Sequence, residues 1–261
     1  MRDPHVVALH YRLETGPQLA FRDPAPVDEE AGAFSLRLDN GELHVTMKHH
    51  FATVEDARLV VEPYLRSWEI ATGLDNGPGA VRFRFDRPDV IDRAPLPPGS
   101  HRIVTVTGSL QVQCVSTVTL TTTRNLYPAP PRTFQASPDV VAMWERYEGY
   151  LAGKEPLSGM AFHCLTIVQQ SVGGPQPRRQ AALRYAIEYD VLSRLGYFAS
   201  EVGDARTVRK RVPGQTLRPH TPAETAWMEA VVKRLIQRVG EWAADPNAKW
   251  PQITMTDFPS L

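Results

Sequence analysis

Residues 156–174 read PLSGMAFHCLTIVQQSVGG, and the second half of the chain is organised around them. Between Met160 and Val168 apolar side chains would point to nearly every side of a helix. A helix that lacks a polar face is normally buried among other helices. Gly173 and Gly174 then end it, as glycine commonly does. The stretch therefore predicts the central helix of a helical bundle.

Helices are predicted on both sides of this central one. Ser137 followed by Pro138 is a typical helix start, with a serine cap and proline in the first turn. After Pro177, apolar residues at helical spacing predict one helix over 178–199. The last helix begins at Thr221-Pro222-Ala223-Glu224, which has the pattern of a capping box. The tail 250–261 is apolar enough to dock on the bundle.

The first half of the chain has the alternating pattern of strands. Residues 5–13 and 34–47 alternate apolar with polar, and Asn40-Gly41 favours a tight hairpin turn. Thr53 caps an amphipathic helix that contains Pro63, so a kink or break is expected near Leu59. Further strands are expected at 81–87 and within 103–123. Residues 19–21 are a candidate partner of the first strand. Residues 23–30 are predicted to form a surface loop.

The proline-rich segment 127–131 separates these two patterns, since each proline stiffens the chain around it. The sequence thus predicts an α+β protein of two domains. An N-terminal antiparallel β-sheet domain with one packed helix covers residues 1–130. A C-terminal bundle of about four helices covers residues 131–261.

Composition narrows the class of protein. The 261 residues include 29 Lys plus Arg and 29 Asp plus Glu, so overall charge favours neither nucleic acid nor an anionic membrane. No apolar run approaches a membrane span, and the polar start lacks the apolar core of a secretory signal. A cytoplasmic protein without a membrane partner is expected. Its two cysteines, Cys114 and Cys164, are predicted to be reduced and buried.

Few residues suggest catalysis or metal binding. His49 and His50 are adjacent, so on a strand they would point to opposite faces, and solvated side chains are favoured over a metal pair. His163 and Cys164 are about 100° apart around a helix, which favours a structural histidine and thiol over a catalytic pair. Neither a nucleophile elbow nor a phosphate-binding glycine loop is present. No metal or cofactor is predicted.

A basic loop between the last two predicted helices is the strongest candidate for binding. It carries Arg206, Arg209, Lys210, Arg211, Arg218 and His220. Together with Arg178, Arg179 and Arg184 it could form an anion or RNA footprint. A solvated flexible loop is the alternative, and the lack of aromatic residues in the loop weakens base stacking.

Three segments of the second half resemble known sequences: Trp144-Glu145-Arg146-Tyr147, residues 156–161 and Arg209-Lys210. The resemblance is to uncharacterised bacterial two-domain proteins whose helical half is similar to HEPN-type bundles. That resemblance implies a dimer in a defence or toxin system that cuts RNA. HEPN catalysis uses an arginine and a histidine with four to six residues between them on one helix. This spacing is absent from the predicted bundle here; Arg37 and His44 match it, but they lie in the strand hairpin. The resemblance thus implies an inactive, binding member.

Two functions follow from these patterns. The first is a non-enzymatic interaction or assembly protein, homodimeric through aromatic residues of the helical half or bound to a protein partner. The alternative is a metal-independent ribonuclease of HEPN type, in which Arg211, Arg218 and His220 are the candidate catalytic residues and Arg206, Arg209, Lys210 and Arg211 contact RNA. The sequence leaves open whether the protein is an enzyme.

Overall fold

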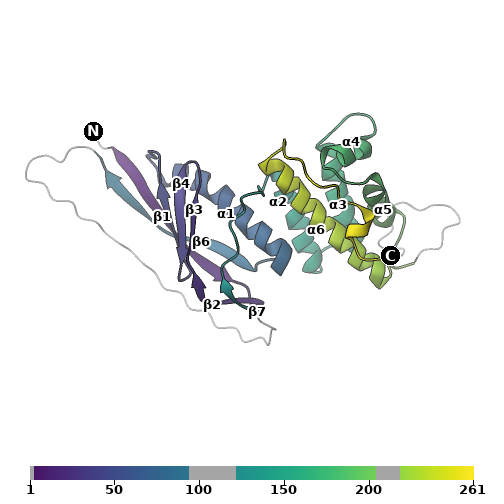
Figure 1. The fold of residues 1–261 in the computed structure, drawn as a ribbon, viewed down its shortest axis with the longest axis horizontal. Helices are drawn as coiled ribbons and strands as arrows, with labels where there is room; N and C mark the ends of the chain where they lie inside the picture. The colour runs from purple at the N-terminus through teal and green to yellow at the C-terminus, as the bar shows by residue number, and fades with distance from the viewer. Residues whose placement is uncertain (1–2, 94–121, 204–217) are drawn as a thin grey trace, which may run out of the picture. The chain divides into compact units, whose positions relative to one another are not determined.

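The computed structural model describes residues 3–93, 122–203 and 218–261 (Figure 1). The chain divides into two compact units, Met1–Pro131 and Arg132–Leu261. The first combines a five-stranded antiparallel sheet with one helix, and the second is helical. The predicted α+β class is confirmed.

The sheet of the first unit has the strand order β3-β4-β5-β1-β6, and every neighbouring pair is antiparallel. Its hairpin turns at Asn40 and Gly41, whose φ angles are 49° and 76°. This left-handed backbone is the one that a tight hairpin turn requires, so the predicted turn is confirmed. The strands are β1 (Pro4–Thr15), β3 (Val27–Glu30), β4 (Phe34–Asp39), β5 (Glu42–Met47) and β6 (Val81–Asp92).

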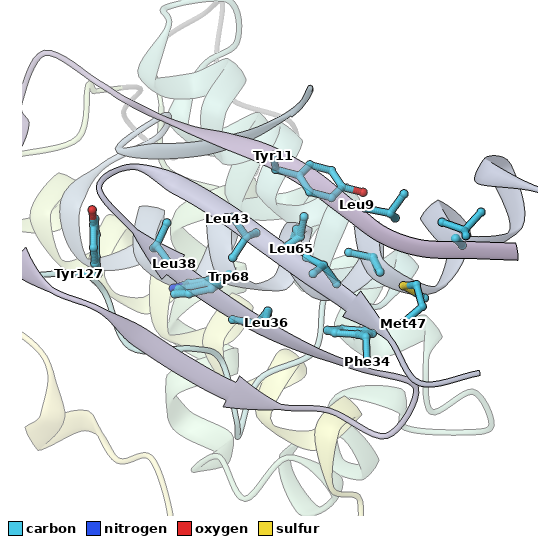
Figure 2. Packing of buried hydrophobic residues seen from close by; sticks show 14 residues of the cluster. Leu9, Tyr11, Phe34, Leu36, Leu38, Leu43, Met47, Leu65, Trp68 and Tyr127 are labelled. Atoms are coloured by element: carbon cyan, nitrogen blue, oxygen red, sulfur yellow. The ribbon is translucent and has the colours of Figure 1, made fainter. Parts of the chain in front are cut away.

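Helix α1 (Val54–Asn76) packs against one face of this sheet. Thr53 caps it by accepting a hydrogen bond from the Asp56 backbone N–H, as predicted. Pro63 does not break the helix; Leu59, whose carbonyl loses its donor, lies at an exposed position where water can replace it. Figure 2 shows the packed side chains, which include Leu36, Leu38, Leu43, Leu65 and Trp68.

Two expectations for this unit are wrong. Strand β2 (Leu19–Ala25) pairs in parallel with β7 (Thr122–Leu126) in a separate two-stranded sheet and not with β1. Residues 27–30, predicted to belong to a loop, form β3 and pair with β4. Acidic residues are tolerated there because β3 is an edge strand with mostly solvent-facing side chains.

The helical unit is built around α3 (Leu157–Gln170). This helix contacts the four others, which confirms the prediction of a central helix. Its side chains Met160, Ala161 and Cys164 are completely shielded from solvent. The surrounding helices are α2 (Pro138–Leu151), α4 (Pro177–Arg184), α5 (Tyr189–Ser200) and α6 (Pro222–Ala244), and a short 3-10 helix, η1 (Met255–Asp257), follows in the tail.

The single helix predicted over 178–199 is in fact two, α4 and α5. Between them Ala186 has a φ angle of 47°, and Ile187 pairs with Ile253 of the tail in an isolated parallel bridge. The buried guanidinium of Arg238 in α6 donates to the carbonyls of Tyr185, Ala186 and Pro251. Distant contacts therefore replace the helical hydrogen bonds at the break.

Candidate functional site

The basic loop predicted to contact RNA lies mostly outside the described residues. Arg206, Arg209, Lys210 and Arg211 fall within 204–217, so their role stays a prediction. Arg218 and His220 are described, and both lie immediately before α6.

Arg218 forms a two-pronged ion pair with Glu224. Its Nη1 and Nη2 atoms donate to the two carboxylate oxygens at 2.7 and 2.5 Å. These bonds are the main reason that the pKa of Glu224 is lowered to about 2. Glu224 also accepts from the Thr221 backbone N–H, which completes the predicted capping box. The positive charge of Arg218 is thus balanced within the start of α6.

His220 is held by the end of α5. Its Nε2 atom lies 3.1 Å from the Phe198 carbonyl oxygen, and because a carbonyl only accepts, the imidazole donates this bond. The Phe198 ring in turn packs edge-on against Trp227 of α6. His220 therefore joins two helices, a structural role that accounts for its position.

Cys164 has the surroundings of a structural thiol. Its side chain is fully buried and its Sγ atom lies 3.8 Å from the Met143 carbonyl oxygen. Burial raises the pKa of the thiol to about 12, so it is protonated and a poor nucleophile at neutral pH. Cys114, the other cysteine, lies outside the described residues.

His49 and His50 follow β5 and are both exposed. The His50 Nε2 atom is 3.6 Å from a carboxylate oxygen of Asp3, and its ring stacks on that of His5. Among residues 3–93, 122–203 and 218–261, no group of three or more His, Cys, Asp or Glu side chains is placed to hold a metal ion.

A hollow of about 500 Å³ opens beside the start of α4. Its volume is within the usual range for small-ligand pockets, about 300–1,000 Å³. The last turn of α3, the loop before α4, the first turn of α4 and the first residue of α5 all contribute to it. The lining residues are Gln169, Gln176, Pro177, Arg178, Arg179 and Tyr189.

The loop that shapes this hollow reverses the chain between α3 and α4. Gly173, Gly174 and Gln176 have φ angles of 63°, 74° and 59°. Glycine adopts this left-handed region without steric cost, which explains two of the three positions. Pro177 then occupies the first turn of α4, where no intrahelical donor is required. The reversal sets the end of α3 beside the arginines of α4.

Arg178 extends across the neighbouring helix α5. Its Nη2 atom lies 2.7 Å from the position that a Cβ atom would occupy on Gly196, so the absence of a side chain there admits the guanidinium. Its Nε atom is buried and has no hydrogen-bond partner among the described residues.

Arg179 lies on the other side of the hollow. Its guanidinium carbon is 5.9 Å from the centre of the Tyr189 ring, and its Nη1 atom is 3.4 Å from the Gln176 side-chain oxygen. Both contacts are weak at these distances. Tyr189 is 44% exposed, so one part of its ring is open to solvent. Arg179 can therefore turn toward a ligand at little cost.

The charge of this hollow is positive. Two guanidinium groups line it, and none of its lining residues is acidic. The remaining polar groups are two glutamine amides and one phenol. A guanidinium is a planar fork of donors that matches the oxygens of a phosphate or carboxylate. The hollow therefore has the chemistry to bind an oxyanion.

The sequence pointed to part of this site. Arg178 and Arg179 were expected near the basic loop, as was Arg184, but Arg184 donates to the Ser171 carbonyl at 2.6 Å and lies over the Trp242 ring. Gln169, Gln176 and Tyr189 were missed because they are separate in sequence and belong to no motif. The glycine pair before Gln176 was the available signal, since it implies a sharp reversal.

The aromatic residues expected to form a dimer surface lie within the helical unit. Trp144 is 1% exposed, Trp227 is fully buried and Tyr147 is 6% exposed. Tyr150 donates a hydrogen bond to the Glu229 carboxylate. Trp144, Tyr147 and Trp227 are therefore used in one core, and the homodimer stays a prediction.

Comparisons with models of protein families, with curated proteins and with solved structures gave no match to this chain. Of the helices in the described part, none combines the length and apolar character needed to span a membrane.

Proposed function

We propose that the protein is a non-enzymatic binding protein whose helical unit recognises RNA through its phosphate groups. The observation that carries this proposal is the hollow beside α4, where Arg178 and Arg179 meet without an acidic lining residue. An arginine pair of this kind contributes both charge and directed hydrogen bonds to a phosphate.

The shape of the hollow favours one nucleotide of a single strand. Tyr189 presents a half-exposed ring at its edge, and aromatic rings stack on bases without strong sequence preference. The amides of Gln169 and Gln176 can both donate to and accept from a base or ribose. The basic loop that precedes α6, with Arg206, Arg209, Lys210 and Arg211, would extend the same footprint along the strand.

Binding without cleavage is favoured over ribonuclease activity. Arg218 is paired with Glu224, and the His220 Nε2 atom donates to the Phe198 carbonyl. A catalytic pair needs free groups that can approach the same phosphate. Arg218 and His220 have structural partners instead, which supports an interaction or assembly role, while Arg211, the third candidate, lies outside the described residues.

The test is the binding of a fluorescent single-stranded RNA to the purified full chain, measured by anisotropy over a salt series. The variant R178Q/R179Q should bind more weakly, and the slope of log affinity against log salt should fall by about 1.4, or about 0.7 for each phosphate that an arginine no longer neutralises. The control K154Q/K249Q removes the same charge at two exposed lysines of the helical unit. It should change neither quantity appreciably.

Three outcomes contradict the proposal. Equal weakening in both double variants would mean that only overall charge attracts RNA. Undetectable binding by the wild type at low salt would remove the RNA ligand altogether. Cleaved RNA in the presence of a chelator, absent with His220→Ala, would replace the binding function with the ribonuclease.

A further inference from the structure

One row of polar residues crosses all five strands of the sheet in the first unit. The strand register places His10 opposite His44, with Arg37 and Asp28 continuing the row on one side and Arg87 on the other. Leu36, Leu38, Leu43 and Val45, which alternate with these positions, are buried toward α1. The row therefore lies on the sheet face that α1 does not cover.

The Nδ1 atoms of the His10 and His44 rings face each other. The two Nδ1 atoms are 3.4 Å apart, and the rings meet edge to face with their centres 4.7 Å apart. The His10 side chain is 19% exposed, and His44 is open to solvent. The pair is thus accessible from outside and supported from beneath by the sheet.

Asp89 determines which ring nitrogen of His10 carries the proton. Its carboxylate lies 2.8 Å from the His10 Nε2 atom, so the imidazole donates from Nε2. A neutral histidine carries one N–H, and the lone pair of His10 is then on Nδ1, directed at His44. Histidines that bind metals commonly donate their second nitrogen to a carboxylate in this way.

The distance between the two nitrogens suits a shared metal ion. With metal–nitrogen bonds of about 2.0–2.1 Å, nitrogens this far apart subtend an angle of about 110° at the metal, close to tetrahedral. Without a metal, the same geometry is accounted for by a hydrogen bond from His44 to His10. Conversion to the metal-bound state requires the His44 proton to move from Nδ1 to Nε2 and both Nδ1 lone pairs to turn toward one point.

The arginines of the row that flanks the histidine pair are each paired with a carboxylate. Arg37 is paired with Asp28 and Asp39, and Arg87 with Asp86, which also binds Arg12. Asp89 adds a further negative charge directly behind His10.

We propose that His10 and His44 form a two-imidazole site for a divalent transition-metal ion, with Asp89 as the outer partner of His10. Since no third His, Cys, Asp or Glu is placed as a ligand within the described residues, water completes the coordination. Imidazole suits Cu²⁺, Ni²⁺ and Zn²⁺; the near-tetrahedral angle matches Zn²⁺, while the general order of affinities makes Cu²⁺ the tightest-binding probe of the site. This site lies in the β-rich unit and does not depend on RNA binding.

The test is titration of the full chain with Cu²⁺ alone, followed by calorimetry and by electron paramagnetic resonance, which reports nitrogen ligands. One equivalent should bind to the wild type. His10→Ala and His44→Ala should each weaken binding at least tenfold and remove one nitrogen from the spectrum. Asp89→Asn should weaken binding about tenfold while keeping both nitrogens, as expected for an outer-shell partner.

His50→Ala is the matched control, because His50 is also exposed and stacks on another histidine without facing nitrogens. It should bind Cu²⁺ as the wild type does. Loss of binding in His50→Ala alone would move the site to the end of the sheet. Equal binding in the wild type and both His10 and His44 variants, or none in the wild type, would overturn the proposal.

Discussion

The arginines on the polar face of the sheet and those of the hollow in the helical unit differ in whether they are paired with carboxylates. On the sheet, Arg37 donates to both carboxylate oxygens of Asp28 at 3.1 and 3.0 Å, and Arg87 is paired with Asp86. In the hollow, Arg178 and Arg179 have no carboxylate partner among the described residues. Both regions are exposed and polar, yet Arg37 and Arg87 are compensated by carboxylates and the arginines of the hollow are not.

This difference separates charges that serve the fold from charges that can serve a ligand. A paired arginine must give up its carboxylate before it binds an anion, and that exchange removes much of the gain. An unpaired arginine at a concave surface loses only water. Removing a paired arginine should therefore lower stability, whereas removing an arginine of the hollow should lower binding.

The largest effect is expected at Arg238, the arginine whose donors are most completely used. It is fully buried, donates to three backbone carbonyls and pairs with Glu241 at 2.8 Å. Arg238→Ala should lower the free energy of unfolding by about 3–5 kcal/mol, since the partners stay buried without their donor. Urea denaturation would measure this loss. RNA affinity, measured on the folded fraction, should not change.

Arg234 offers a control one turn earlier on α6, because it donates to the same Glu241 from a partly exposed position. Arg234→Ala should cost about 1 kcal/mol or less. If Arg238→Ala fails to fold, Arg238→Lys keeps the charge but not the fork of donors, and should still cost more than Arg234→Ala. Equal costs would mean that the Arg238 bonds do not hold the break between α4 and α5.

The break that Arg238 stabilises also shows why part of the fold escaped prediction. The hairpin at Asn40-Gly41 and the capping box at Thr221 depend on residues within a few positions of each other, and both were predicted correctly. The end of α4 depends on Arg238 and on Ile253, which are more than fifty residues away. Helical spacing continues through the break, so local pattern alone gives one helix.

In the candidate sites, too, some features follow from the local sequence and others depend on distant packing. Charge count alone indicated Arg178 and Arg179, but their isolation from carboxylates depends on how the helices pack. The pairing of His10 with His44 depends on the register between β1 and β5, which the alternating pattern does not specify. Sequence thus identified charged residues, while topology determines which of them meet.

A smaller effect is expected from the paired charge at Glu224, and it should depend on pH. Because Arg218 lowers the pKa of Glu224 to about 2 from an ordinary 4.5, the folded state holds its proton less tightly than the unfolded state. The resulting stabilisation is complete above pH 4.5 and is lost as pH falls toward 2. Denaturation of the wild type and Glu224→Gln at pH 7 and pH 3 would test this.

Glutamine preserves the capping box, so Glu224→Gln removes only the charge. The wild type should be the more stable protein at pH 7, and the difference should shrink at pH 3. A difference that is the same at both values would mean that the ion pair contributes no stability. Arg218 would then be available to a ligand, and the comparison between paired and unpaired arginines would fail at this residue.

The smallest effect on stability, and the sharpest test of the hollow, is expected at Gly196. An alanine Cβ would lie 2.7 Å from the Arg178 Nη2 atom, so the flexible guanidinium must move. Alanine favours a helix over glycine by up to about 1 kcal/mol, so Gly196→Ala should leave stability unchanged or slightly higher. RNA affinity should nevertheless fall severalfold, because Arg178 is displaced without being removed.

Gly159→Ala in α3 is the control, since an added Cβ there meets only ordinary contacts, the nearest at 3.4 Å from Pro156. It should show a similar change in stability and no change in RNA affinity. Thermal unfolding and anisotropy on the same preparations would give both quantities. If Gly196→Ala binds RNA as Gly159→Ala does, then the position of Arg178 over α5 is only packing. RNA binding by the hollow would then depend on Arg179 alone.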